Sequence, residues 1–253
     1  MFVTSYGRVT QPVVAVVGLW DPLLADHRDL FQQLCAHARE RALAASVVVI
    51  DPDPVKLLHG AAQVPVYDDL ATRLELLRAC RLDAILRLRF AKKDLVAGAA
   101  EFFTALQGPV QLQELWLGAR QTLGSGASGS FQTILDCAAQ HHTQITRLPD
   151  VALKAAGRTI RGLLLSGRVA EARALVGRPP GRRRPRGARL RFAWPAGTYQ
   201  VAPLSAPTAP LAGPPFTLQL EPDAAGLCRA TWPDRRIKYL VFLSGPGDAP
   251  GAN

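Results

Sequence analysis

Apolar runs alternate with segments of helical periodicity along the first part of the chain. Residues 12–17 and 45–50 are continuous runs rich in β-branched side chains, which is typical of strands buried on both faces of a sheet. Between them, residues 27–45 repeat apolar side chains at helical spacing. The order strand, helix, strand is the unit from which parallel sheets are built.

The same alternation continues to residue 176. Further helices are expected over 67–80, 95–106, 131–140, 151–165 and 169–176, and further strands over 84–88, 111–117 and 143–148. We therefore predict an α/β fold in which a doubly wound parallel sheet carries helices on both faces.

The composition of the chain changes after residue 176. Residues 177–187 read GRPPGRRRPRG, a mixture of Pro, Gly and Arg that favours neither a helix nor a strand interior. Five β-like segments separated by turn formers follow, at 188–193, 198–201, 216–221, 228–232 and 237–243. We predict a first domain over 1–176, a linker over 177–187, a small β module over 188–245 and a disordered tail over 246–253.

Composition places the chain among proteins with a large apolar core. Hydrophobic residues make up 48% of its 253 residues, yet no apolar run reaches the length of a membrane span. The four cysteines are far apart and form no C-x-x-C pair. We expect free thiols in a cytoplasmic protein, no disulfide and no metal site. His141 and His142 are adjacent, so their side chains diverge, and they have no partner at ligand spacing.

The chain carries a formal net charge of +10, which suggests a nucleic-acid partner. All but five of the 30 basic residues are arginines, and many lie between Arg158 and Arg191. In the 177–187 tract, prolines stiffen the chain and no aromatic side chain interleaves with the arginines. The pattern favours a solvated linker over an RNA contact or an acidic protein partner.

The junction between the first strand and the first helix, Gly18 to His27, is a natural place for a phosphate. Free N–H groups and the helix dipole both attract anions there. The junction is neither a P-loop nor a G-x-G-x-x-G loop. Asp26 is expected to cap the helix. His27 can donate to a phosphate, and the alternative is a solvated residue at the helix start.

This junction resembles the first motif, G-x-F-D-G-x-H-x-G-H, of the FMN adenylyltransferase domain in bacterial bifunctional riboflavin kinase/FAD synthetases. Gly18, Asp21 and His27 match the motif, and Trp20 stands for its aromatic residue. Leu24 replaces the first histidine of the motif. Asp26 replaces the glycine before the second histidine.

Further resemblances follow in the family's order and cover about residues 12–180. Asp53 stands at a histidine position, and segment 82–103 is similar throughout. The flavin-side loop 117–129 keeps its glycines, but Gln121 stands in place of an aromatic residue. Residues 155–161 resemble the serine motif without its serines, and 162–179 resemble the linker out of the domain.

The resemblance implies a nucleotidyltransferase-like domain followed by a small β-barrel-like module. It implies ATP, Mg²⁺ and FMN or FAD as ligands, and transfer of an adenylyl group from ATP to FMN. The residues implied as catalytic are His27, Asp21 and Arg161. Those implied as binding the nucleotide or flavin are Gly18, Trp20, Asp26, Gly118, Gly124, Gly129 and Arg158.

The departures from the motifs predict a slowed or absent reaction. Leu24 cannot donate a hydrogen bond, and the Asp26 carboxylate repels a triphosphate unless a metal ion or Arg158 neutralises it. Mg²⁺ held between the phosphates and Asp21 or Asp26 would compensate. The alternative is a non-catalytic protein that binds a flavin, a nucleotide or a protein partner on the same fold. The C-terminal module lacks Pro-Thr-Ala-Asn after the linker, so we predict no riboflavin kinase activity.

Overall fold

The structure is a computed structural model that describes residues 1–7, 9–60, 64–118, 121–123, 130–149, 153–185, 189–225, 227–234 and 236–249. The chain forms two compact units, each built from segments that are distant in sequence. The first comprises Met1–Trp20, Asp26–Leu58 and Leu77–Val151, and the second Asp21–Ala25, His59–Leu76 and Ala152–Asn253. An α/β unit and an antiparallel β unit confirm the predicted fold class.

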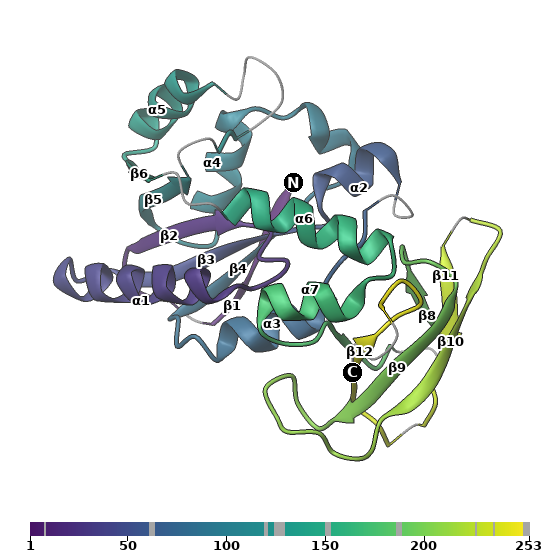
Figure 1. Cartoon of the computed structure of the whole chain (residues 1–253). Coiled ribbons are helices and arrows are strands. Elements are labelled where there is room, and N and C mark those ends of the chain that lie inside the picture. The colour runs from purple at the N-terminus through teal and green to yellow at the C-terminus, as the bar shows by residue number, and fades with distance from the viewer. Residues whose placement is uncertain are drawn as a thin grey trace. The chain divides into compact units, whose positions relative to one another are not determined.

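The first unit is built on a six-stranded sheet in the order β1-β4-β3-β2-β5-β6 (Figure 1). Its strands are β1 (Phe2–Tyr6), β2 (Val13–Gly18), β3 (Ala44–Asp51), β4 (Ala84–Arg89), β5 (Leu112–Gly118) and β6 (Gln144–Leu148). β1, which the sequence pattern did not indicate, pairs antiparallel with β4, whereas all other neighbours are parallel. β2 lies between β3 and β5, and its apolar residues are at most 2% exposed, which confirms the predicted strand buried on both faces.

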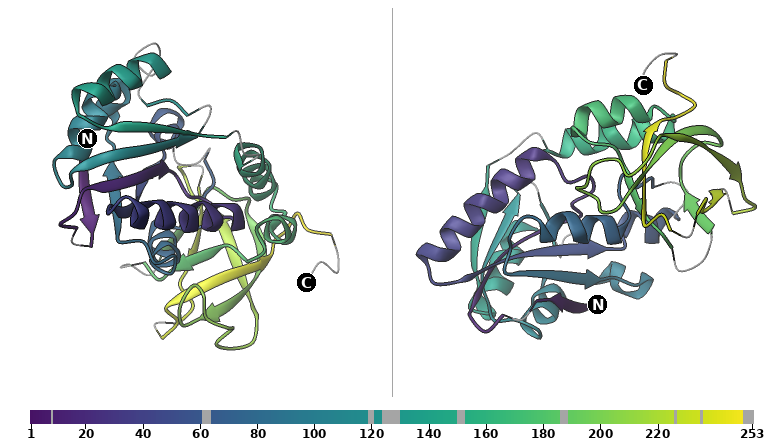
Figure 2. Two further views of the ribbon diagram at one scale, coloured as in Figure 1. Left: turned by 90° about the vertical axis from the view of Figure 1, so that its left-hand side faces the viewer. Right: turned by 90° about the horizontal axis from the view of Figure 1, so that it is seen from below.

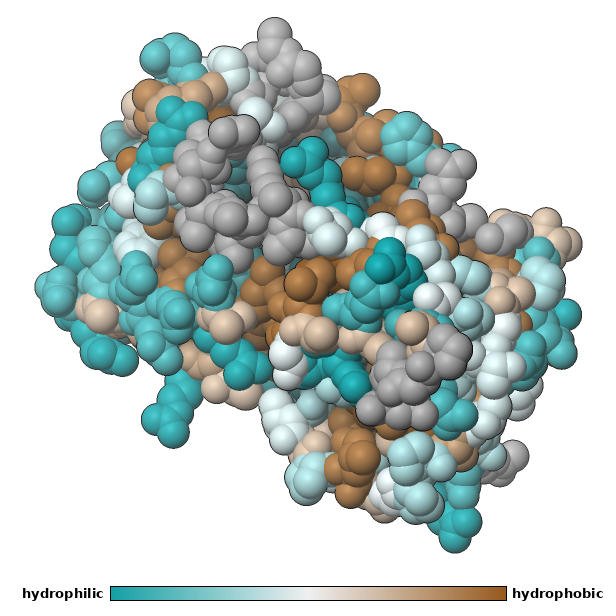
Figure 3. All heavy atoms as spheres, viewed as in Figure 1, coloured by the Kyte–Doolittle hydropathy of each residue, from teal (hydrophilic) through white to brown (hydrophobic). Residues whose placement is uncertain are grey.

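Helices cover both faces of this sheet. They are α1 (Ala25–Glu40), α2 (Pro54–His59), the 3₁₀ helix η2 (Lys92–Val96), α4 (Ala99–Gln107) and α5 (Phe131–Gln140). α1 lies on one face, and α4 and α5 lie on the other (Figures 1 and 2). The outer side of α1 is hydrophilic (Figure 3), so the helix presents its apolar stripe to the sheet.

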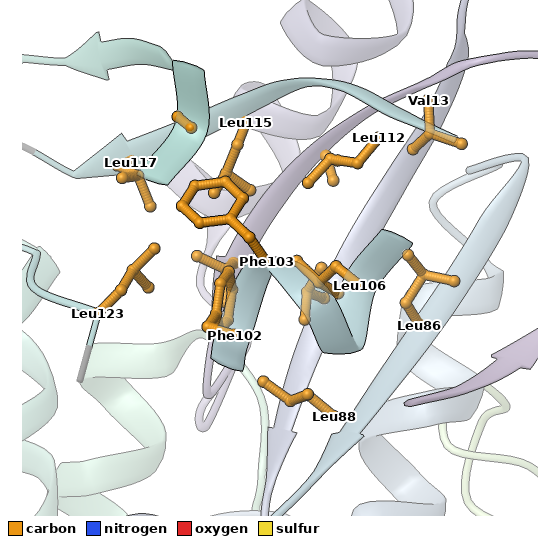
Figure 4. Packing of buried hydrophobic residues seen from close by; sticks show 14 of the residues in the cluster. Val13, Leu86, Leu88, Phe102, Phe103, Leu106, Leu112, Leu115, Leu117 and Leu123 are labelled. Atoms are coloured by element: carbon orange, nitrogen blue, oxygen red, sulfur yellow. The ribbon is translucent and has the colours of Figure 1, made fainter. Parts of the chain in front are cut away.

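The core on the α4 face is built from aromatic and leucine side chains (Figure 4). Phe102, Phe103 and Leu106 of α4 are at most 3% exposed and point toward leucines of β4 and β5. Each such side chain contributes roughly 1.5–3 kcal/mol through burial. This packing holds α4 against the sheet and sets the positions of the strand ends.

The second unit combines helices with an antiparallel sheet that curls into a half-barrel. The helices are α3 (Leu70–Arg78), which belongs to this unit as far as Leu76, α6 (Leu153–Leu165) and α7 (Val169–Val176). The sheet order is β7-β12-β9-β10-β11-β8. The strands are β7 (Gly181–Arg183), β8 (Arg189–Phe192), β9 (Gly197–Leu204), β10 (Phe216–Pro222), β11 (Cys228–Thr231) and β12 (Tyr239–Ser244). Trp194, Tyr199 and Phe242 form an aromatic centre in its core.

The arginine tract is not a solvated spacer at Arg182. This residue lies in β7, which pairs with β12, and it is only 4% exposed. Its guanidinium donates to the carbonyl oxygens of Tyr67 at 2.6 Å and Val66 at 2.8 Å. It also lies 4.8 Å from the ring centroid of Trp194. The linker interpretation was wrong here because these partners lie far away in the sequence.

The first residues of the predicted disordered tail are held in place. Asp248 accepts hydrogen bonds from the backbone N–H of Ala170 at 3.0 Å and of Gly245 at 2.7 Å. The expectation of disorder was therefore wrong for residues 246–249, and residues 250–253 lie outside the described part of the chain.

Candidate functional site

The direction of the sheet order reverses between β2 and β5. From β2 the chain passes to β3 and β4 on one side, and it then returns to β5 on the other side. In open α/β sheets, ligands bind outside the carboxyl ends of the strands at such a switch point. Gly18 ends β2 and Gly118 ends β5. The structure thus brings two of the predicted glycines to one edge of the sheet.

The indole of Trp20 folds back over the end of β2. Its Nε1 donates to the carbonyl oxygen of Val48 at 3.0 Å, and the residue is 6% exposed. A Cβ atom at Gly18 would lie 3.0 Å from the indole carbons Cε2 and Cζ2. Gly18 is therefore required for this close approach, and the aromatic side chain occupies the strand end itself.

His27 lies in the first turn of α1 and meets Trp20 edge to face, with their ring centroids 5.2 Å apart. Burial lowers the pKa of His27 to about 4, against the opposing effect of the Asp26 carboxylate. The imidazole is therefore neutral near pH 7. It can donate a hydrogen bond to a phosphate but adds no positive charge.

Asp26 is exposed and lies inside the first turn of α1, because the helix begins at Ala25. The expectation that Asp26 occupies the N-cap position was wrong. A carboxylate in the first turn interacts favourably with the helix dipole. The negative charge of Asp26 therefore already makes the favourable interaction with the helix dipole that an anionic ligand would make.

Gln121 joins the two strands at the switch point. Its Oε1 accepts from the N–H of Gly118 at 3.2 Å, and its Nε2 donates to the carbonyl oxygen of Val17 at 3.1 Å. No motif assigned a role to this residue, and the only signal was its position in place of an aromatic residue. Gly124 and Gly129, which follow in the same loop, lie outside the described residues.

Asp21 belongs to the second unit, whereas Gly18, Gly118 and His27 belong to the first. Its carboxylate accepts from the backbone N–H of Asp68 at 2.8 Å and of Tyr67 at 3.1 Å. Burial raises the pKa of Asp21, and Arg73 opposes this effect. Both carboxylate oxygens of Asp21 thus accept hydrogen bonds from the backbone. No three side chains of the described residues form a metal-binding group.

Asp21 is one part of an ionic network within the second unit. Asp68 is fully buried, pairs with the guanidinium of Arg178 and accepts from the N–H of Gly181 at 2.9 Å. Charges buried in this way must be paired to be tolerated. The network therefore gives Asp21 a structural task, which is to hold the backbone at Tyr67 and Asp68.

The residue at the first motif histidine, Leu24, is a core residue. It is 8% exposed and belongs to the apolar cluster of the second unit, together with Tyr67, Ile160 and Leu164. Asp53, at another histidine position, is also buried and accepts from the N–H of Val55 at 2.9 Å at the start of α2. Both positions therefore have structural roles in this chain.

The two predicted arginines lie on α6 of the second unit. Arg158 and Arg161 are three residues apart, so they share one side of the helix. Arg158 is exposed, and Arg161 is half-buried. The structure thus groups Gly18, Trp20, Asp26, His27 and Gly118 in the first unit, and Asp21, Arg158 and Arg161 in the second.

Comparison with known proteins places these observations in a family. The model of the FAD synthetase family matches residues 7–159. The bifunctional riboflavin kinase/FMN adenylyltransferases of Escherichia coli (strain K12) and Shigella flexneri are 24% identical to this chain over 170 residues. That match covers 66% of the chain but only 54% of the relatives, about half their length.

A solved structure shares the fold. The crystal structure titled as a macrolide-efflux protein from Streptococcus pneumoniae superimposes with a TM-score of 0.61 and 17% identity. It covers 96% of this chain and 88% of that one. At this identity the likeness concerns the fold alone. Among the helices of the described residues, none is long and apolar enough to cross a membrane.

Proposed function

This chain belongs to the FAD synthetase family, and from that membership we propose that it binds an adenine nucleotide and a flavin and adenylylates FMN slowly. The ligands lie at the carboxyl edge of β2 and β5, where the family-matching residues Gly18, Trp20 and His27 come together. The reaction is transfer of the adenylyl group of ATP to FMN, which gives FAD and pyrophosphate.

The burial of Leu24 is the observation that supports slow adenylyl transfer. Adenylyl transfer needs hydrogen-bond donors or cations around the phosphoryl group as charge shifts to the leaving pyrophosphate. Leu24 takes the place of one such donor and is packed in an apolar core. The remaining imidazole, His27, is neutral. The N–H groups at the start of α1 then supply the main attraction for phosphate.

Mg²⁺ travels with ATP in such reactions and neutralises phosphate charge. The carboxylate of Asp21 is also bonded to backbone N–H groups of residues 67 and 68, and a metal ion would have to share its oxygens with them. Asp26, which is exposed, is the carboxylate of the junction that fits a metal ion carried by the nucleotide.

A second candidate function is binding without catalysis. It is favoured by the side chains that cover the strand ends at the switch point, since Trp20 lies over Gly18 and Gln121 bridges Val17 and Gly118. A flavin or nucleotide would then be held at the edge of the sheet without the donors that transfer requires.

The rate of FAD formation tests the proposal. The protein is incubated with FMN, ATP and Mg²⁺, and FAD is measured by chromatography beside an intact family member. We expect a rate lower by at least about 10²-fold, since one lost donor costs about 2.7–4 kcal/mol. A rate equal to that of the intact enzyme would contradict the proposed effect of Leu24.

Calorimetry separates the two candidate functions. Binding of ADP or FMN without detectable FAD supports the non-catalytic reading. Absence of binding by either compound overturns both, and it would leave the fold with a partner-binding role.

A further inference from the structure

Three contacts within the first unit anchor the indole of Trp20. Its Nε1 donates to the carbonyl oxygen of Val48 at 3.0 Å, and its ring meets that of Phe31 edge to face at a centroid distance of 5.0 Å. The third contact is with Gly18, where a Cβ atom would lie 3.0 Å from the indole carbons. Val48 and Phe31 are at most 1% exposed, so the indole is attached to the close-packed core.

The backbone of Trp20 lies in the left-handed region, with φ at 53°. Residues that carry a side chain rarely adopt this conformation. They keep it only where the surrounding structure over-determines it, and such positions are concentrated at functional sites. At Trp20 the surrounding contacts are those of the indole. The turn after β2 and the place of the indole therefore depend on each other.

The indole makes one more contact, with the imidazole of His27. The two rings meet edge to face, with an interplanar angle of 89°. Trp20 is 6% exposed, whereas His27 is half-buried. The indole thus offers little surface on which a base or a flavin could stack. Part of the imidazole stays accessible in the first turn of α1, where the N–H groups of the helix attract phosphate.

We propose that Trp20 is a positioning residue, whose anchored indole sets the orientation of the His27 ring for donation to a nucleotide phosphate and does not stack on the ligand. The inference rests on the proposed function, because that function supplies the phosphate. A donor stabilises the transition state best when its direction is fixed beforehand. The indole also shields the imidazole from water, which adds to the burial that lowers the pKa of His27 against the opposing charge of Asp26.

The Trp20→Phe variant tests the proposal, because it keeps an aromatic ring but loses the hydrogen bond to Val48. The pKa of His27, followed by NMR of its ring protons, should rise from about 4 toward 6.5 by about one unit or more. In the assay of FAD formation, kcat should fall about tenfold while KM for ATP stays nearly unchanged.

Trp232→Phe is the matched control in the second unit. Trp232 is also 6% exposed, and its Nε1 likewise donates to a backbone carbonyl oxygen, that of Ile237 at 3.0 Å. This variant should leave the His27 titration and kcat at their wild-type values. An unchanged His27 titration in Trp20→Phe, or an equal change in both variants, overturns the proposal.

A double variant shows whether Trp20 acts through His27. If it does, Trp20→Phe/His27→Gln should be no slower than His27→Gln alone, whereas multiplied losses would overturn the proposal. A wild type that forms no FAD would count against the proposed function. The His27 titration of the ligand-free protein would still decide whether Trp20 holds the imidazole.

Solvent exchange of the Trp20 indole N–H provides a test in the wild-type protein, which stands even if the variants fold poorly. The N–H should be protected from exchange, and it should stay protected when ADP or FMN is added, because the bond to Val48 is kept. Loss of protection on addition of either compound would show that the indole leaves the strand end to meet the ligand, and this overturns the proposal.

Discussion

Single residues at the junction after β2 have taken on structural tasks. Leu24 packs in the core of the second unit, and Asp21 holds two backbone N–H groups. His27 contacts Trp20 and keeps a polar tip, but burial lowers its pKa and keeps the ring neutral. The chemistry left at the junction is therefore hydrogen-bond donation, and little positive charge is available to a triphosphate.

Restoring the motif histidine at Leu24 should destabilise the protein. The Leu24→His change removes apolar contacts and buries a polar ring, so we expect a loss of about 2–5 kcal/mol in the free energy of unfolding. Urea unfolding measures it, with Leu24→Met as the control, which should cost less than about 1.5 kcal/mol. An equally stable histidine variant that forms FAD faster would show that the side chain at position 24 faces the ligand and not the core.

The titration of His27 should make the protein sensitive to acid. Its pKa falls from 6.5 in the unfolded chain to about 4 in the folded one. The unfolded chain therefore takes up the proton first, and stability that is complete above pH 6.5 is lost as the pH falls toward 4. Each unit of displacement is worth about 1.4 kcal/mol, so the loss is about 3 kcal/mol.

Thermal melts between pH 7 and pH 4 measure this effect. His27→Gln has no imidazole to protonate and should lose less stability on acidification than the wild type. The matched control is His59→Gln, which alters an exposed histidine at the end of α2. Parallel curves for the wild type and His27→Gln would mean that His27 is accessible to protons in the folded state.

At the scale of elements, buried polar groups tie neighbouring helices and strands together. Glu114 of β5 is 1% exposed and meets His37 of α1, Trp116 of β5 and Thr146 of β6. Burial acts to raise the pKa of Glu114, but the hydrogen bonds from Thr146, His37 and Trp116 outweigh it and lower that pKa. This carboxylate orients α1 on the sheet. Gln121 has the same effect on β2 and β5 at the switch point.

The start of α7 should depend on Asp248. This carboxylate accepts from the N–H of Ala170 in the first turn, where a negative charge also suits the helix dipole. Asp248→Ala should cost about 1–2 kcal/mol and increase hydrogen exchange of the α7 amides. Asp248→Asn, which keeps an acceptor oxygen, should cost less. Unchanged exchange in both variants would mean that the segment around Asp248 does not cap α7 in solution.

At the scale of the whole molecule, the two units contribute different things. The first unit supplies the sheet edge with the family-matching glycines, and the second supplies the curled antiparallel sheet. The match to the curated relatives spans about half of their length. The β module follows α7 in sequence, at the place where riboflavin kinase activity would be expected from the resemblance to the bifunctional enzymes.

We expect no riboflavin kinase activity from this protein. The phosphate-holding Pro-Thr-Ala-Asn sequence is missing after the linker, and the Pro-Thr-Ala at 207–209 lies instead in a turn after β9. Incubation with riboflavin, ATP and Mg²⁺, followed by chromatography, should give no FMN. Formation of FMN at rates of about 1 s⁻¹, within the usual range of kinases, would contradict the expectation.

The sequence by itself determined most of the helices and strands of the first 176 residues, the doubly wound fold class and the burial of β2 on both faces. These follow from hydrophobic periodicity, which depends on residues that are close together along the chain. It did not reveal β1 or β7, which are short and pair with strands elsewhere in the chain.

Only the tertiary structure decided what the polar residues do. Arg182 and Tyr67 are 115 positions apart, and Asp21 and Tyr67 are 46 apart, yet each pair shares a hydrogen bond. An arginine or an aspartate can be solvated or buried, and it can be catalytic or structural. The local sequence looks the same whichever of these roles the residue has. The free energy of a charge depends on its solvation and its partners, and both are set by segments that meet only when the chain folds.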